Sequence, residues 1–271
     1  GVIMVAMCLN FVSMSKGSMD RICEVLNEKT TLPAPQEPVT EVGDGSVEFE
    51  NVNFAYSQSA DDYVLSNVNL KIEAGSTVGV IGATGSGKTS LVSLIPRLYE
   101  ATEGSVKVGG VDVRNYDMEV LRNNVAMVLQ KNVLFSGSVA ENLRWGDENA
   151  TDEELRNAAR QACAEEFIDA LPDGYDYDLG QGGVNVSGGQ KQRLCIARAL
   201  LKKPKVIIFD DSTSAVDTKT DALIRDALKK HAPETTKIII AQRIASVQDA
   251  DKIIVMDDGI ISATGTHDEL M

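Results

Sequence analysis

The chain has 271 residues, 43% of them hydrophobic, which is enough for one large domain or for one domain with an appendage. Its formal net charge of -14 argues against a nucleic-acid-binding surface, because contacts to phosphates need an excess of Lys and Arg. The two histidines are too few for a His-based metal site. The cysteines lack metal or redox spacing and are expected to be reduced thiols: Cys8, Cys23, Cys163 and Cys195.

The first segment is almost wholly apolar but runs only from Gly1 to Met14, whereas a membrane-spanning helix needs about 20 such residues. It lacks the basic start of a signal peptide. Lys16 and Arg21 follow it, as expected at the cytoplasmic end of a span. We interpret residues 1–30 as the end of a last transmembrane helix and its cytoplasmic extension. The alternative is an amphipathic docking helix of a soluble protein.

The next segment, TTLPAPQEP, contains three prolines, which end the helical pattern and predict an extended linker over residues 31–44. Residues 45–271 are then expected to form one globular domain. It opens with two alternating patterns typical of strands, at 46–56 and 64–72.

Apolar runs further along the chain predict strands buried on both faces, as in a parallel sheet. Two such runs lie at 205–211 and 236–242, and a short buried strand that runs into glycines is predicted at 77–82. A hairpin with Asp-Gly at its turn is predicted over 252–264. Helices are predicted over 151–171, where Thr151 and Glu154 offer a capping box, and over 217–232. The predicted fold class is therefore α/β, with a mostly parallel sheet and antiparallel strands near the start.

The sequence GATGSGKT matches the phosphate-binding pattern G-x-x-x-x-G-K-[ST] between a predicted strand and a helix, the context that supports the motif. Its glycines let backbone N–H groups wrap phosphate oxygens, and the helix N-terminus adds partial positive charge. Lys88 would reach the β- and γ-phosphates of ATP, and the Thr89 hydroxyl would ligate Mg²⁺. The predicted nucleotide-binding residues are Gly82, Ala83, Thr84, Gly85, Ser86, Gly87, Lys88 and Thr89.

Two adjacent aspartates end the apolar run VIIF. Asp210, at the end of a buried strand, fits the carboxylate that holds Mg²⁺, usually through water. Asp211 stands where a general base for the attacking water would lie.

The pentapeptide VSGGQ, Val186–Gln190, lies between the phosphate-binding loop Gly82–Thr89, the P-loop, and this strand. The ordered set of motifs resembles the nucleotide-binding domain of an ABC transporter over about residues 45–271. The resemblance implies a P-loop NTPase core, an antiparallel β subdomain and a helical signature subdomain at about 131–190. The sequence QKNVLFSGSVAENL, and a helix that leads directly into the domain, resemble half-transporters of the exporter type.

The resemblance also implies roles for single residues. Tyr56 matches the aromatic residue that stacks on adenine, and Gln130 matches a catalytic-site glutamine that touches Mg²⁺ and the transmembrane part. The loop at 212–217 resembles the one that crosses between two such domains. The signature residues would meet the γ-phosphate of ATP held by a partner domain: Ser187, Gly188, Gly189 and Gln190.

Two catalytic positions depart from the family pattern. Asp211 replaces the usual Glu, and it is one methylene shorter. Gln242 replaces the usual His, and it cannot take a charge or relay a proton. A weaker departure is Gln181, where exporters often carry Glu. Because the binding motifs are intact, the pattern resembles the degenerate subunit of a heterodimeric exporter, in which one composite site hydrolyses fast and the other mainly holds ATP.

These features predict an ATPase domain on the cytoplasmic side of the cell membrane. Its expected partners are a second ABC half-transporter subunit and the transmembrane domain of the same chain, with no nucleic acid. Three alternatives stay open: a homodimer that hydrolyses slowly at both sites, a soluble ABC ATPase of DNA repair or translation, and a nucleotide-gated binding module without useful catalysis.

Overall fold

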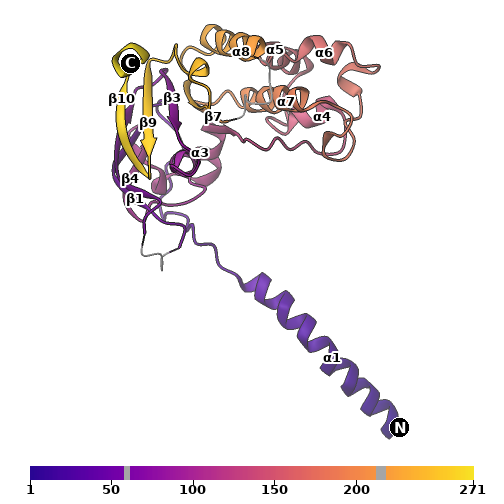
Figure 1. Ribbon diagram of the computed structural model, residues 1–271. Coiled ribbons are helices and arrows are strands. Elements are labelled where there is room, and N and C mark those ends of the chain that lie inside the picture. The colour runs from indigo at the N-terminus through magenta and orange to yellow at the C-terminus, as the bar shows by residue number, and fades with distance from the viewer. Residues whose placement is uncertain (58–61, 212–217) are drawn as a thin grey trace. The chain divides into compact units, whose positions relative to one another are not determined.

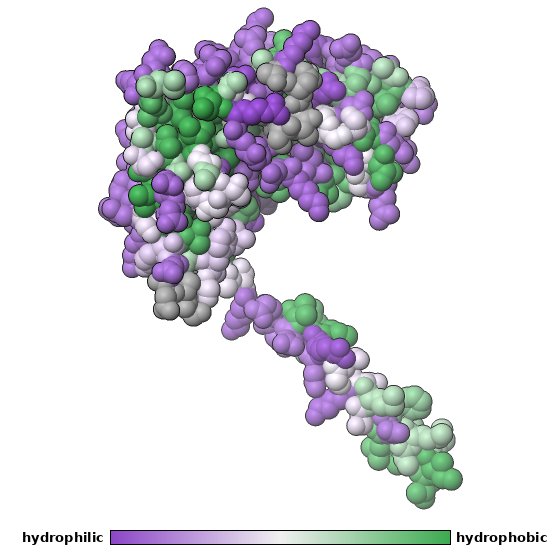
Figure 2. All heavy atoms as spheres, in the orientation of Figure 1, coloured by the Kyte–Doolittle hydropathy of each residue, from purple (hydrophilic) through white to green (hydrophobic). Residues whose placement is uncertain are grey.

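The computed structural model describes residues 1–57, 62–211 and 218–271, and the chain forms two compact units, Gly1–Pro33 and Ala34–Met271. The first unit holds one helix, α1 (Val2–Asn27), in which every residue is exposed. By length and composition alone, α1 could cross a membrane. Apolar side chains gather at its N-terminal end (Figure 2). The interpretation of residues 1–30 as the end of a transmembrane helix stays a prediction.

The second unit contains an antiparallel four-stranded sheet with the strand order β2-β1-β4-β5. Its strands are β1 (Val47–Phe54), β2 (Leu65–Ile72), β4 (Glu103–Val108) and β5 (Val111–Asp112). The first two correspond to the alternating patterns in the sequence, with one face of each strand buried. Val39 pairs with Tyr116, and Val42 is buried. Part of the segment predicted to be a linker, residues 31–44, therefore contacts this domain.

A six-stranded sheet has the order β10-β9-β3-β8-β7-β6, and all its neighbouring strands are parallel except β9 and β10. Its strands are β3 (Thr77–Gly82), β6 (Val125–Val128), β7 (Val206–Asp210), β8 (Thr236–Ile240), β9 (Lys252–Asp257) and β10 (Ile260–Gly265). Every residue of β7 and β8 is buried, which explains their continuous apolar runs. The predicted mostly parallel sheet is confirmed.

The helices between β6 and β7 form a group of their own beside the sheets (Figure 1). They are α4 (Val139–Arg144), α5 (Asp152–Gln161), α6 (Glu165–Asp169) and α7 (Gly188–Leu201). The predicted single helix over 151–171 is wrong in one respect: Cys163 has a φ of 54° and separates α5 from α6. The predicted capping box of Thr151 and Glu154 is present at the start of α5.

The remaining helices are α2 (Lys88–Ser93), α3 (Met118–Asn124), α8 (Thr218–His231) and α9 (His267–Leu270). Two apolar cores lie on opposite faces of the parallel sheet. Along β7, Ile207 and Phe209 belong to the core shared with the helical group, whereas Val206 and Ile208 belong to the core shared with the antiparallel sheet. The parallel sheet is therefore covered on both faces, and its strand ends remain available for a site.

Candidate nucleotide-binding site

The residues predicted to bind nucleotide follow four neighbouring parallel strands. β3 leads into the P-loop, β7 ends at Asp210, β8 is followed by Gln242, and β6 is followed by Gln130. Because β3, β8, β7 and β6 run parallel, their carboxyl ends meet at one edge of the sheet. Ligands of open α/β sheets bind outside this edge.

The P-loop glycines adopt backbone conformations that other residues rarely reach. Gly82, Gly85 and Gly87 have φ values of 152°, 86° and 91°. A Cβ at Gly82 would collide with the backbone of Met256, and one at Gly87 would press on Leu65. A Cβ at Gly85 would meet nothing within 4 Å, so the loop is open there.

The Lys88 side chain folds back against the loop that precedes it. Its ammonium donates to the carbonyl oxygens of Gly82 and Ala83, at 2.9 and 2.6 Å, and to Ser86 Oγ at 3.3 Å. Burial lowers the pKa of Lys88, and the carboxylates of Asp210 and Asp211 oppose this shift. These contacts hold a cation beside the glycines, where phosphates would bind.

Two oxygen ligands suited to Mg²⁺ lie next to the P-loop. The Thr89 hydroxyl donates to Asp210 Oδ1 at 3.1 Å, and Asp210 is 6% exposed. Burial raises the pKa of Asp210, and the neighbouring charge of Asp211 adds to the increase. A hydroxyl and a carboxylate beside a phosphate cradle fit a hard cation that takes oxygen ligands.

Asp211 is held differently from Asp210. It has a φ of 47°, and its amide donates to Ile240 O at 3.1 Å. Its Oδ2 accepts hydrogen bonds from Gln130 Nε2 at 3.0 Å and from Gln242 Nε2 at 2.5 Å. The structure thus brings together the three residues predicted to be catalytic, and both amides donate to one carboxylate oxygen.

Tyr56 lies beside the same loop. Its hydroxyl forms a 2.9 Å hydrogen bond with Ser90 Oγ, in the helix that follows the P-loop. Its ring contacts Phe54 and Tyr99 edge to face, and the residue is 56% exposed. Sequence reasoning missed Ser90, which the adjacent motif could have flagged, and Tyr99, for which no sequence pattern points to the site.

The signature residues lie at the start of α7 and form a reciprocal cap. Ser187 N donates to Gln190 Oε1 at 2.8 Å, and Gln190 N donates to Ser187 Oγ at 3.3 Å. A Cβ at Gly188 would meet nothing within 4 Å. Within the described residues, no hydrogen bond joins this cap to the P-loop or to Asp211. The predicted crossing loop, 212–217, lies outside the described residues.

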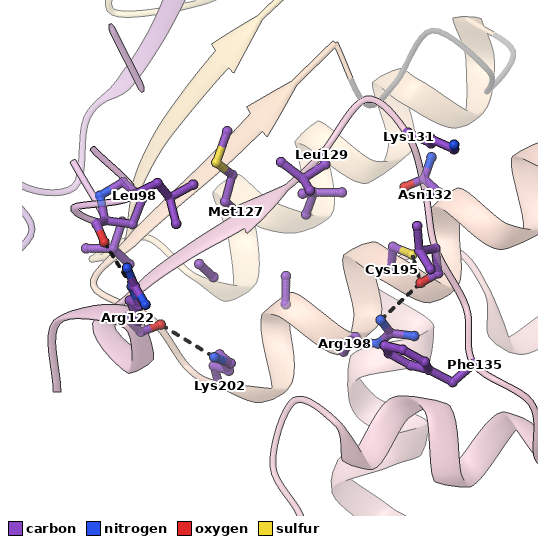
Figure 3. Close-up of a pocket in the computed structure, with 16 residues that line it drawn as sticks. Leu98, Arg122, Met127, Leu129, Lys131, Asn132, Phe135, Cys195, Arg198 and Lys202 are labelled. Atoms are coloured by element: carbon purple, nitrogen blue, oxygen red, sulfur yellow. Dashed lines mark hydrogen bonds between the residues drawn. The ribbon is translucent and has the colours of Figure 1, made fainter. Parts of the chain in front are cut away.

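A separate groove of about 320 Å³ begins next to Gln130 (Figure 3). Leu129 and Lys131, on either side of Gln130 in the sequence, both line the groove. Phe135 and Arg198 also line it, and Arg198 Nη1 donates to Val133 O at 3.2 Å. No P-loop residue lines this groove, so it is distinct from the nucleotide site.

Residues 65–214 match the family model of the ABC transporter. The chain belongs to the ABC transporter family. It is 43% identical over 89% of its length to an ATP-dependent lipid A-core flippase of Alkalilimnicola ehrlichii, of which it covers 42%. It is 39% identical over 99% of its length to ABC transporter B family member 2 of Dictyostelium discoideum, of which it covers 20%.

A solved structure of a bacterial Atm1-family ABC exporter with ATP bound matches with a TM-score of 0.93 and 33% identity, over 98% of this chain and 47% of that one. The predicted likeness to exporter-type ABC ATPase domains and the predicted α/β fold are therefore confirmed. The chain spans less than half the length of these ABC relatives. The roles of single residues stay predictions.

Proposed function

We propose that this chain is the ATP-binding and ATP-hydrolysing domain of an ABC exporter. The observation that carries the proposal is the convergence of Lys88, Thr89 and Asp210 at the strand ends of an ABC-family fold. The P-loop and Lys88 would hold the phosphates, and Tyr56 would stack on adenine. Thr89, Asp210 and Gln130 would hold Mg²⁺, which would offset the charge on the phosphates.

The site of this chain is proposed to be degenerate, that is, to bind ATP but hydrolyse it slowly. Asp211 is shorter than Glu, so its carboxylate would stand roughly 1 Å back from the attacking water, a shift that can cost about 10²-fold. Asp211 Oδ2, one of the two carboxylate oxygens that could accept the proton of the attacking water, also accepts hydrogen bonds from Gln130 and Gln242. Gln242 cannot relay a proton in place of His.

A second half-transporter subunit would complete the active assembly. The cap formed by Ser187 and Gln190 leaves the start of α7 exposed and open at Gly188. This surface would face the γ-phosphate of ATP bound to the partner, as a helix N-terminus favours anions. We favour a heterodimer, because the signature is intact while the chain's own catalytic positions are altered. A slow homodimer is the alternative.

The membrane assignment rests on α1 and on the exporter relatives. The domain would lie on the cytoplasmic side of the cell membrane, next to the transmembrane domain of the same protein. The groove beside Gln130 offers that domain apolar and basic side chains, among them Leu129, Phe135 and Lys202. Gln130 would then connect the membrane part to Asp211.

Titration of the 271-residue chain with a fluorescent ATP analogue in the presence of Mg²⁺ tests nucleotide binding. Lys88→Ala should weaken affinity by roughly 10- to 100-fold, because it removes charge-assisted hydrogen bonds to the phosphates. Lys71→Ala is the matched control, since Lys71 is an exposed lysine paired only with Glu73 among the ion pairs of the described residues. Equal affinities of the Lys88 variant and the wild type would refute the proposed function.

A further inference from the structure

Three aromatic rings meet beside the P-loop, with Tyr56 at the centre. The ring centroids of Tyr56 and Phe54 are 4.9 Å apart, and those of Tyr56 and Tyr99 are 5.0 Å apart. Both contacts are T-shaped, with interplanar angles of 74° and 88°. Edge-to-face pairs of this kind are favoured by the aromatic quadrupole. Because Tyr56 is still 56% exposed, its neighbours support the ring without covering it.

The far end of the Tyr56 ring is fixed by a hydrogen bond. The phenol oxygen lies 2.9 Å from Ser90 Oγ, and Ser90 is buried in the first turn of α2, directly after Thr89. The phenol is therefore tied to the helix that carries Lys88 and Thr89. This bond sets the distance between the ring and the phosphate cradle.

The backbone that carries Tyr56 is fixed by the segment that carries Tyr99. The Ala55 amide donates to Thr102 Oγ1 at 3.0 Å, and the Thr102 amide donates to Asn53 O at 2.9 Å. Two independent sets of contacts thus converge on one exposed aromatic ring. The torsion about the bond to a Tyr ring is otherwise broad, so an unsupported ring would sample many planes.

We propose that Tyr99 and Ser90 are positioning residues for binding of the nucleotide's base. They hold the Tyr56 ring in one plane and at one distance, so that a purine can stack on it while its triphosphate reaches the P-loop. The proposal rests on the proposed function, since it assumes that the site takes ATP. Neither residue needs to touch the nucleotide, and each acts through Tyr56.

The test measures the dissociation constants of Mg-ATP and of Mg-tripolyphosphate, which lacks the base, by calorimetry on the 271-residue chain. Tyr99→Ala should weaken ATP binding by about threefold to tenfold, the size expected for one aromatic pair. Tripolyphosphate affinity should change by less than about twofold, because the cradle itself is untouched. Tyr99→Phe should restore ATP affinity, because it keeps the ring that contacts Tyr56.

A double-mutant cycle tests Ser90 in the same way. Tyr56→Phe and Ser90→Ala should each weaken ATP binding by about threefold, and the double variant should lose little more than either single variant. That non-additivity shows that both changes remove the same hydrogen bond. Tripolyphosphate binding again controls for damage to the P-loop.

The other outcomes contradict the positioning role, base stacking or the proposed function. Equal losses for ATP and tripolyphosphate would place the effect in the phosphate cradle and overturn the positioning role. Unchanged ATP affinity in both Tyr99→Ala and Ser90→Ala would overturn it as well. Wild-type chain that binds tripolyphosphate as tightly as ATP would refute base stacking while leaving phosphate binding intact. Wild-type chain that binds neither ligand would refute the proposed function itself.

Discussion

Asp210 and Asp211 are neighbours in the sequence, yet their surroundings differ. Asp210 is the last residue of a buried strand and accepts a hydrogen bond from Thr89. Asp211 turns into a left-handed conformation and accepts two side-chain amides. This change of backbone direction points one carboxylate toward the P-loop and the other toward Gln130 and Gln242. In the proposed function, Asp210 would hold the metal and Asp211 would lie beside the attacking water.

Replacement of both altered catalytic residues should raise hydrolysis at this site. Asp211→Glu with Gln242→His restores the longer carboxylate and removes one of its two amide donors, so we expect turnover in the assembled transporter to rise by about 10²-fold. Single changes should gain less, because residues that act in one step are non-additive. Single-turnover phosphate release is the measurement. A double variant as slow as the wild type would leave the degenerate site without a mechanism.

At the scale of the element, α5 shows how a surface helix is fixed to the domain. Thr151 Oγ1 accepts from Glu154 N at 3.3 Å, and Glu154 Oε2 accepts from Thr151 N at 3.0 Å. Lys203 Nζ, beyond the end of α7, donates to Glu154 Oε1 at 2.7 Å. One carboxylate therefore caps α5 and joins it to the segment before β7.

Loss of the cap should destabilise the domain. Thr151→Ala removes the oxygen that accepts from the Glu154 amide, and we expect the free energy of unfolding to fall by about 1 kcal/mol. Denaturation by urea, followed by circular dichroism, measures it. Thr151→Ser is the matched control, since Ser keeps the cap hydroxyl. The same loss in both variants would contradict the role of the hydroxyl.

The Glu154 carboxylate also predicts how stability depends on pH. The hydrogen bond from Lys203, with help from Thr151, lowers the pKa of Glu154 to about 2 from 4.5. A carboxylate whose pKa is lowered by folding stabilises the fold at pH values above its pKa in the unfolded chain. This contribution is lost as pH falls from 4.5 toward about 2. The difference in the free energy of unfolding between the wild type and Lys203→Met should therefore shrink as pH falls through that range. Parallel pH profiles of the two proteins would contradict the linkage.

The elements also show what the sequence could and could not predict. Continuous apolar runs identified β7 and β8, and a short apolar stretch before the glycines identified β3. The P-loop motif located their shared edge, because burial and phosphate binding leave local patterns. The break at Cys163 leaves no such pattern, since the left-handed position after the end of α5, where Ala164 N donates to Ala159 O and Cys163 N to Arg160 O, is usually marked by Gly and here carries Cys. The support of Tyr56 by Tyr99 depends on a tertiary contact across a distance in sequence that no periodicity encodes.

At the scale of the whole molecule, the separation of the signature from the P-loop is the feature with the largest consequence. Ser187 and Gln190 cap α7 on the helical group, whereas Lys88 and Asp211 lie at the strand ends. A site that needs both halves would require a second chain. Damage to the signature of this chain should then appear in the hydrolysis performed by its partner.

The central claim is that this chain holds the slow site and completes the fast one, and steady-state ATP hydrolysis by the assembled transporter tests it most directly. Gly188→Arg adds a side chain at a position where a Cβ meets nothing within 4 Å, and it should block the partner's γ-phosphate. We expect its rate to fall by about 10²-fold or more, with ATP still bound at this chain's P-loop. Asp211→Asn, which touches only the slow site, should leave the rate within about twofold of the wild type. Loss of ATP hydrolysis in Asp211→Asn, together with an unchanged rate in Gly188→Arg, would contradict this claim.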